Sequence, residues 1–216
     1  FELKAQGLAA VARQAGDALL LIVPKGFQPG DDALSALVAR ARADGDLDDK
    51  GSKTVNAYRV EGIAARRVAI AAVGEGGARE VRGAVQAAVS AWKAQPVRRA
   101  CIAFAANPSP AALRAAVAAA GDASYVYTTT RSVAEGRKLS VLRLVVPGTE
   151  GLQETFRRAE ATFQGVELAR EWGNRPANHA TPTRLAEAAR ALARTGRIDC
   201  EVLGPKEVAR LGMGAF

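Results

Sequence analysis

The sequence predicts an α/β fold in which helices flank a mixed β-sheet, and two observations support this. First, short apolar runs of strand length alternate with segments whose apolar residues recur every three or four positions. Such alternation is typical of βαβ units, whose strands pair in parallel. Second, some runs follow each other closely enough to pair antiparallel, so we expect a mixed sheet. The chain has 216 residues, 49% of them hydrophobic, which is enough to bury a sizeable core.

Runs rich in β-branched, aliphatic and aromatic residues predict the strands. They lie at residues 17–23, 55–60, 66–74, 98–106, 124–130 and 139–147. Helices are expected between them at residues 31–41, 78–94 and 109–121. The last of these has Ser109 as its cap, Pro110 at its first position and Gly121 just past its end. A polar loop rich in aspartate is expected at 45–54.

A long helix is predicted from Glu150 to Trp172, because its apolar residues form one continuous stripe. The stripe consists of Leu152, Phe156, Ala159, Phe163, Val166 and Ala169. At about 1.5 Å per residue, this helix would extend roughly 33 Å, which is about the diameter of a small domain. A helix of this length after a completed α/β unit often connects two domains.

The segment that follows this helix carries two prolines and the one histidine of the chain. Gly173 and Asn174 end the helix, and Pro176 restricts the backbone of the residue before it. His179 has no second histidine or cysteine at metal-ligand spacing. We therefore favour a joint between domains over an active-site loop.

Beyond the joint, the sequence predicts a helix that begins with Thr181 and Pro182. Its buried face would consist of Leu185, Ala189 and Leu192. Residues 198–203 would then form a strand and residues 204–212 a short helix. These elements offer too little apolar surface for a core of their own. We interpret them as the beginning of a second α/β domain that continues beyond Phe216.

Composition excludes several classes of protein. The longest apolar runs have strand length, far below the roughly 18 residues of a membrane span, and no signal-peptide pattern is present, so we expect a cytoplasmic protein with no membrane partner. Cys101 and Cys200 each lie in a run that predicts a strand, which indicates two buried thiols rather than a disulfide. A cysteine nucleophile would need a nearby histidine, and the chain offers only His179.

The net charge of +8 is spread along the chain. Residues 1–150 hold 20 basic and 14 acidic side chains, and residues 151–216 hold 10 and 8. Nucleic-acid binding would need the basic groups on one face, together with aromatic residues. The sign of the charge suits nucleic acid but no such motif accompanies it, so nucleic acid is kept only as an alternative partner.

The joint and its surroundings resemble a known family. The stretch "LAREWGNRPANHATPTRLAEAARALA", followed by "CEVLGPKEVARLGMGAF", resembles the leucyl (cytosol) aminopeptidase family at its domain junction. The matching positions are Ala169, Arg170, Asn174, Pro176, Asn178, Thr181, Pro182, Leu211, Gly212, Met213 and Gly214. Upstream, the acidic "DGDLDDKG" loop and the strands that follow it fit the family's pattern ending in Val-Gly-x-Gly. The resemblance covers the whole chain and is strongest after about residue 165.

The resemblance implies a macro-like α/β domain at 1–149, a linker helix and Pro-rich joint at 150–180, and the truncated start of the catalytic peptidase domain at 181–216. In this family the catalytic domain binds two divalent metal ions, zinc or manganese, and removes residues such as leucine from the amino terminus of peptides. Members typically form homohexamers. The family's catalytic positions all follow the Met-Gly segment, so we expect no catalytic, cofactor-binding or metal-binding residue in this chain. We expect it to be inactive without the catalytic domain of the same polypeptide.

A glycine-rich turn and an acidic loop could each be read as a ligand site. Gly74, Gly76 and Gly77 lie between a strand and a helix, where backbone N–H groups can hold phosphate, and macro-like folds bind ADP-ribose. The loop lacks a full dinucleotide fingerprint and a P-loop lysine, which favours a tight turn. The spacing of Asp44, Asp46, Asp48 and Asp49 is similar to that of a calcium loop. It lacks the flanking helices and the terminal glutamate, which favours a solvated loop.

Overall fold

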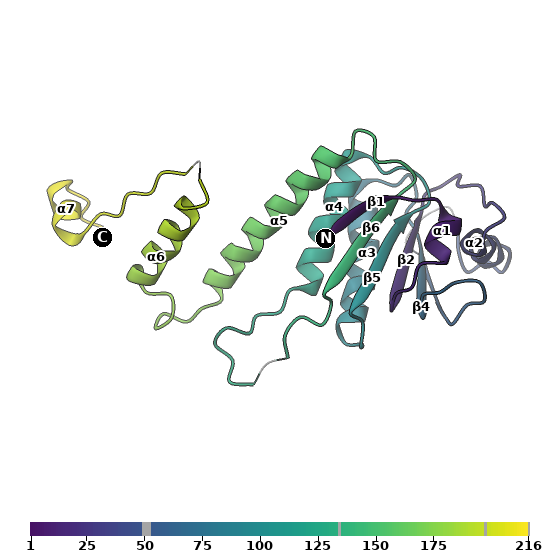
Figure 1. Cartoon of the computed structure of the whole chain (residues 1–216), viewed down its shortest axis with the longest axis horizontal. Coiled ribbons are helices and arrows are strands. Elements are labelled where there is room, and N and C mark those ends of the chain that lie inside the picture. Colours follow the sequence, from purple (N-terminus) through teal and green to yellow (C-terminus); the bar gives the residue numbers. More distant parts are fainter. Residues whose placement is uncertain (49–52, 134, 197, 216) are drawn as a thin grey trace. The chain divides into compact units, whose positions relative to one another are not determined.

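A six-stranded mixed sheet forms the centre of the amino-terminal unit, Phe1–Ala169, of the computed structural model (Figure 1). The structure describes residues 1–48, 53–133, 135–196 and 198–215. The strands are β1 (Glu2–Ala5), β2 (Ala18–Val23), β3 (Thr54–Tyr58), β4 (Arg67–Ala72), β5 (Arg99–Phe104) and β6 (Val141–Val146). Their order is β1-β6-β5-β2-β4-β3, and all neighbours are parallel except β3, which runs antiparallel to β4. The predicted α/β class and mixed sheet are confirmed.

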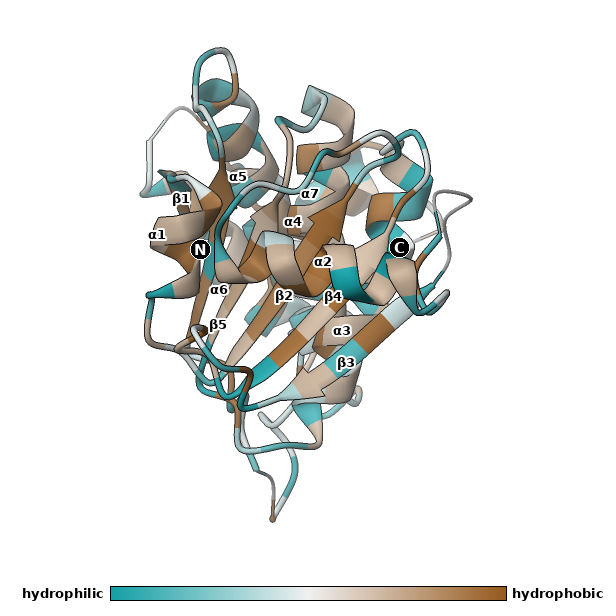
Figure 2. Cartoon of the chain, turned by 90° about the vertical axis from the view of Figure 1, so that its right-hand side faces the viewer, coloured by the Kyte–Doolittle hydropathy of each residue, from teal (hydrophilic) through white to brown (hydrophobic). Residues whose placement is uncertain are grey.

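Helices cover both faces of this sheet. They are α1 (Leu8–Ala12), α2 (Ala33–Ala43), α3 (Ala78–Lys93), α4 (Pro110–Ser124) and α5 (Gln153–Gly173). Residues of α1 and α2 pack on one face of the sheet, and residues of α3, α4 and α5 pack on the other. Figure 2 shows α2 lying across apolar strands, which are drawn in brown. This arrangement confirms the predicted helices at residues 31–41 and 78–94.

The central strand β2 explains why the sheet needs both layers. All six of its residues are buried. Successive side chains point to opposite faces, so that Leu20 joins the core beneath α3 and α4 while Leu19 and Leu21 join the core beneath α2. A parallel strand buried on both faces has a continuous apolar sequence, and this is the pattern of residues 18–23.

The end of α4 differs from the prediction. Ser109 accepts a hydrogen bond from the backbone N–H of Ala112, as expected of the cap, but the helix continues through Gly121 to Ser124. The expected strand at 124–130 is therefore wrong, because the helix occupies its beginning and the rest lies in irregular structure and a turn. Gly121 does not end the helix. A Cβ atom at this position would lie 2.2 Å from the ring of Phe163.

The start of the chain contains two elements that the sequence did not predict. Strand β1 has four residues, and only Leu3 among them is half-buried. Helix α1 has five residues and follows directly. Both are too short, and β1 too exposed, to produce an apolar pattern. β1 pairs in parallel with β6, so that Glu2 lies beside Arg143.

The long helix is confirmed, but its apolar stripe is buried only in its first half. Phe156, Ala159 and Phe163 are buried, whereas Val166 is 43% exposed. The boundary between the two compact units of the chain, after Ala169, falls within this helix. No helix among the described residues is long and apolar enough to cross a membrane.

The second unit, Arg170–Phe216, contains α6 (Pro182–Ala193) and α7 (Pro205–Arg210). Thr181 caps α6 by accepting a hydrogen bond from the N–H of Arg184, as predicted. The expected buried face is wrong for this chain, because Leu185 and Leu192 are 47% and 42% exposed. The expected strand at 198–203 is also wrong, since this segment has no neighbouring strand in the described part of the unit and no regular structure.

The carboxylate of Asp17, which lies just before β2, is expected to stabilise the fold at neutral pH. Its Oδ2 accepts hydrogen bonds from the N–H groups of Arg99 and Arg98, at 3.0 and 2.9 Å, and these lower the pKa of the carboxyl group. A lowered pKa contributes stability above the unfolded value of about 3.9, and this contribution is lost as pH falls through the folded value. The Asp17→Asn variant should therefore be less stable than the natural chain at pH 7, and the difference should shrink at pH 3.

Urea unfolding at pH 7, 4 and 3 measures this effect. The Asp31→Asn variant is the matched control, because Asp31 is an exposed carboxylate in the loop before α2. A difference between Asp17→Asn and the natural chain that stays constant over this pH range would contradict the prediction.

Candidate functional site

The glycine-rich turn between β4 and α3 has the geometry of a tight turn. Gly74 and Gly76 have φ angles of 51° and 74°, in the left-handed region that favours glycine. The carbonyl of Gly74 accepts a hydrogen bond of 2.6 Å from the N–H of Lys25, which links the turn to the segment after β2. The side chain of Glu80 lies over the start of α3, where a Cβ atom on Gly77 would approach its carboxylate to 2.5 Å. An anion at this helix terminus would meet that negative charge.

The acidic loop before β3 forms an ion pair with a lysine. Asp48 lies 3.1 Å from the Nζ of Lys53, which also donates a hydrogen bond to the carbonyl of Gly45. Asp49 lies outside the described residues. Across the described parts of the chain, no three His, Cys, Asp or Glu side chains come close enough together to hold a metal ion.

The two cysteines are free and half-buried. Cys101 lies in β5 as predicted, whereas the segment of Cys200 is not a strand. Burial raises the pKa of the Cys101 thiol to about 12, although Arg143 nearby lowers it slightly. A thiol with this pKa stays protonated at neutral pH and is a poor nucleophile.

We therefore expect Cys101 to resist alkylation in the folded chain. At pH 8 its thiolate fraction should be on the order of a thousandfold lower than that of an ordinary cysteine with a pKa of about 8.5. Mass spectrometry of the Cys101 peptide after timed exposure to iodoacetamide, with and without guanidinium, measures the rate. Cys200 in the same digest serves as the internal reference. Equal rates for Cys101 in the folded and unfolded chain would contradict this prediction.

His179 lies in a backbone turn of the second unit. Its N–H and that of Ala180 both donate to the carbonyl of Pro176, at 2.8 and 3.0 Å. Its exposed side chain borders an open hollow of about 570 Å³. The guanidinium group of Arg175 stacks over the Trp172 ring at 4.0 Å in the same hollow. The backbone hydrogen bonds stabilise the turn. Among the described residues, no group of metal ligands forms around the imidazole of His179.

A pocket that the sequence analysis missed lies in the amino-terminal unit, at the carboxyl ends of α3 and α4. Its volume is about 150 Å³. Its apolar lining consists of Val89, Trp92, Val97, Val126 and Leu139, and its charged rim consists of Lys93, Glu135, Arg137 and Lys138. The rim comes largely from the connection between α4 and β6, which was expected to begin with a strand. We call this cavity the α3–α4 pocket.

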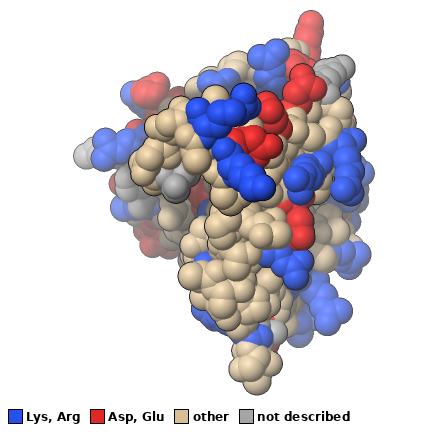
Figure 3. Space-filling model, turned by 90° about the vertical axis from the view of Figure 1, so that its left-hand side faces the viewer, with Lys and Arg blue, Asp and Glu red and all other residues tan. Residues whose placement is uncertain are grey.

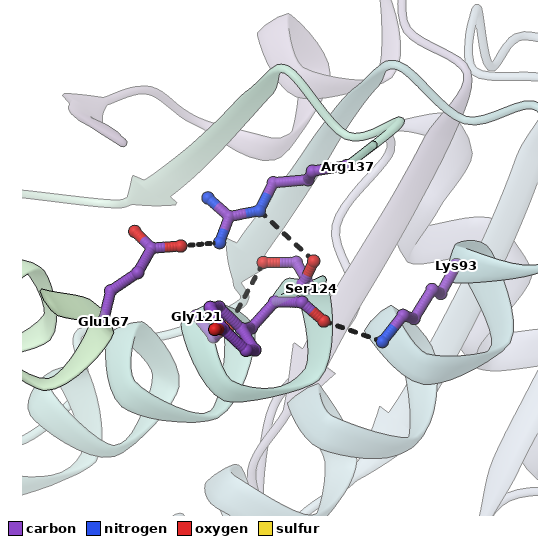
Figure 4. A network of polar contacts seen from close by, with 6 residues as sticks. Lys93, Gly121, Ser124, Arg137 and Glu167 are labelled. Carbon is purple, nitrogen blue, oxygen red and sulfur yellow. Dashed lines mark hydrogen bonds and ion pairs between the residues drawn. The ribbon is translucent and has the colours of Figure 1, made fainter. Parts of the chain in front are cut away.

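Polar contacts hold this connection in place (Figure 4). The Nζ of Lys93 donates a hydrogen bond of 2.8 Å to the carbonyl of Tyr125. The Nε of Arg137 donates to the carbonyl of Ser124 at 3.2 Å, and its guanidinium group pairs with Glu167 of α5. The same guanidinium lies 5.9 Å from the centre of the Phe163 ring. The connection is thus tied to α3, α4 and α5.

Lysine, arginine, aspartate and glutamate are intermixed on the face drawn in Figure 3. Many of the ion pairs in the described structure join such neighbours, as Glu154 does with Arg157 and Arg158. Such neighbouring carboxylates partly neutralise these arginines and weaken their attraction for a nucleic-acid backbone.

Comparison with known proteins places these features in a family. The model of the cytosol aminopeptidase family, N-terminal domain, matches residues 23–134. The chain is 51% identical over all its 216 residues to a probable cytosol aminopeptidase of Albidiferax ferrireducens, of which it covers 45%. It is 50% identical over its full length to a probable cytosol aminopeptidase of Verminephrobacter eiseniae, of which it covers 42%.

Solved structures agree with this result. A mutant of tomato leucine aminopeptidase is 25% identical, with a TM-score of 0.67 over 90% of this chain and 42% of that chain. The bottromycin maturation enzyme BotP in complex with Mn is also 25% identical, with a TM-score of 0.68 over 92% of this chain and 41% of that one. The chain thus spans less than half the length of the relatives that it matches. It belongs to the cytosol aminopeptidase family and corresponds to the amino-terminal part of these longer proteins.

Proposed function

We propose that this chain is the amino-terminal, non-catalytic part of a metal-dependent leucyl aminopeptidase that removes amino-terminal residues from peptides. The observation that carries the proposal is the match of the whole chain to less than half of a probable cytosol aminopeptidase at 51% identity. In this proposal the domains are an α/β domain at 1–149, a linker helix and joint at 150–180, and the start of the catalytic domain at 181–216. The parent protein would be cytoplasmic and would assemble as a homohexamer.

The residues that the structure describes do not fit a bimetallic centre. Such a centre needs several carboxylate or imidazole ligands around two closely spaced ions. Several carboxylates pair with arginine or lysine, as Asp48 does with Lys53, and no group of three metal-ligating side chains forms around His179 or elsewhere in the described parts of the chain. We therefore assign the two manganese or zinc ions of the parent to the part of the polypeptide that follows, and we derive no catalytic step from this chain.

Exposed apolar side chains support a continuation of the second unit. The exposed large apolar residues of this unit are Leu185, Leu192, Ile198, Val202, Leu203, Leu211 and Met213. Exposed apolar surface of this extent marks a contact surface. In the proposed parent, the remainder of the catalytic domain covers these residues, and residues 198–203 gain the strand partner that they lack here.

The test compares the 216-residue chain with the full-length parent on leucyl p-nitroanilide with added manganese. We expect hydrolysis by the parent, its loss after chelation of the metal, and none from the 216-residue chain above the blank. Turnover by the 216-residue chain, or a parent without metal-dependent turnover, would contradict the proposal.

The two alternative functions gain no support from a specific observation. For ADP-ribose binding, the carboxylate of Glu80 lies where a phosphate would approach the start of α3. For nucleic acid, basic side chains such as Arg157 and Arg158 are already paired with a carboxylate, that of Glu154. Binding of ADP-ribose in calorimetry would favour the first alternative. A gel shift of duplex DNA at low salt would favour the second.

A further inference from the structure

The α3–α4 pocket combines a closed apolar floor with a basic rim. Val89, Trp92 and Val97 form the floor, with exposed fractions of 1%, 6% and 1%. Since each of them is anchored in a helix or in the core, the floor is formed before any ligand arrives. Ligand sites typically have this character, with preformed apolar walls and a few polar groups at the opening.

The size of the α3–α4 pocket limits the ligand. Its volume is about 150 Å³. A cavity of about 150 Å³ with apolar walls is large enough to hold benzene. One phenyl ring or one branched aliphatic group therefore fits, whereas a nucleoside or a peptide of several residues does not.

The charges at the rim select an anion. Lys93, Arg137 and Lys138 line the pocket together with one carboxylate, that of Glu135, and Arg137 is also paired with Glu167. The ion pair between Lys138 and Glu135 is 2.8 Å long, but the two side chains are 44% and 81% exposed. An exposed pair of this kind contributes little, so that Lys138 can exchange Glu135 for another carboxylate at small cost. The ammonium group of Lys93 has three donors, of which the carbonyl of Tyr125 uses one.

We propose that the α3–α4 pocket binds a small carboxylate with one phenyl- or isobutyl-sized apolar group. The apolar group lies against Trp92 and Val97, and the carboxylate lies between Lys93 and Lys138. Arg137 holds the rim in place through Ser124 and Glu167. This inference concerns binding by the 216-residue chain and does not depend on the proposed peptidase activity.

Tryptophan fluorescence tests the proposal, because the chain has two tryptophans and one of them lines the pocket. In a Trp172→Phe background, Trp92 is the remaining reporter. We expect a saturable fluorescence change with 3-phenylpropionate and a Kd of about 1 mM, a value typical of a ligand of this size. The neutral isostere 3-phenylpropanamide should bind at least about fivefold more weakly, because it lacks the charge that the rim attracts.

Two variants separate the rim from the fold. Lys138→Gln should weaken the binding of 3-phenylpropionate about fivefold and leave that of 3-phenylpropanamide nearly unchanged. Arg114→Gln is the matched control, since Arg114 is an exposed cation about 15 Å further up α4 from the pocket. It should leave both affinities unchanged. Thermal unfolding of each variant checks that the fold is retained.

Three results would overturn the proposal. The first is the absence of saturation up to about 20 mM 3-phenylpropionate, roughly twenty times the expected Kd. The second is equal affinity for the acid and the amide. The third is an equal loss of affinity in Lys138→Gln and Arg114→Gln, which would indicate a general effect of charge.

Discussion

Replacing Gly121 with alanine is expected to destabilise the amino-terminal unit by about 1–3 kcal/mol. Gly121 is buried in α4, and the ring of Phe163 from α5 occupies the space that a side chain at this position would need. An added Cβ atom would lie 2.2 Å from two ring atoms of Phe163, so that α5 or the ring must move. The guanidinium group of Arg137 also lies 5.9 Å from the centre of this ring.

Urea unfolding of the variant, followed by circular dichroism, measures this loss. Gly83→Ala is the matched control, because Gly83 lies in the interior of α3 with no atom within 4 Å of an added Cβ. That change should stabilise the chain by about 0.5–1 kcal/mol, since alanine favours the helix. A Phe163→Leu change should recover part of the stability lost in Gly121→Ala, because the two sites are in contact. Similar effects of Gly121→Ala and Gly83→Ala would disprove the packing argument.

Replacing Trp92 with alanine is expected to cost about 3–5 kcal/mol, the largest single effect predicted for this chain. Trp92 is the last buried residue of α3 and is 6% exposed. Its indole packs within the core beneath α3 and α4, so its removal would leave a cavity there. The same substitution would enlarge the α3–α4 pocket.

Trp172→Ala is the natural comparison within one chain. Trp172 is half-buried in the second unit, and the guanidinium group of Arg175 stacks on it, a contact worth about 1 kcal/mol. Thermal unfolding followed by circular dichroism should therefore show a large decrease in Tm for Trp92→Ala and a small one for Trp172→Ala. A larger decrease in Tm for Trp172→Ala than for Trp92→Ala would mean that the core beneath α3 and α4 contributes less stability than the contacts of Trp172.

Elements with a strong local signal were predicted correctly from the sequence. The apolar period of α3 and the continuous run of β2 each lie within a few neighbouring residues. Elements whose structure depends on distant partners were not. Gly121 looked like a helix end, but its role depends on Phe163, 42 residues later in the sequence. Residues 198–203 have the composition of a strand, but no strand lies beside them in the part of the chain that the structure describes.

The α3–α4 pocket was unpredictable for the same reason. Its contacts join residues far apart in the chain, as Lys93 with Tyr125 and Arg137 with Glu167, which are 32 and 30 positions apart. No motif of fixed spacing marks such pairs. The cap of α6 at Thr181 could be predicted, because a helix cap and the proline after it lie in one short stretch.

The pairing of β1 with β6 has a consequence for synthesis. The hydrogen bond between Glu2 and Arg143 joins residues 141 positions apart, and β1 has no other neighbour in the sheet. At about 5–20 residues per second, a ribosome needs roughly 7–30 s to make that intervening length. Strand β1 must therefore wait unpaired until β6 emerges from the ribosome. Its brevity and its polar, exposed side chains suit that delay, since they give a passing chaperone or another nascent chain little to bind.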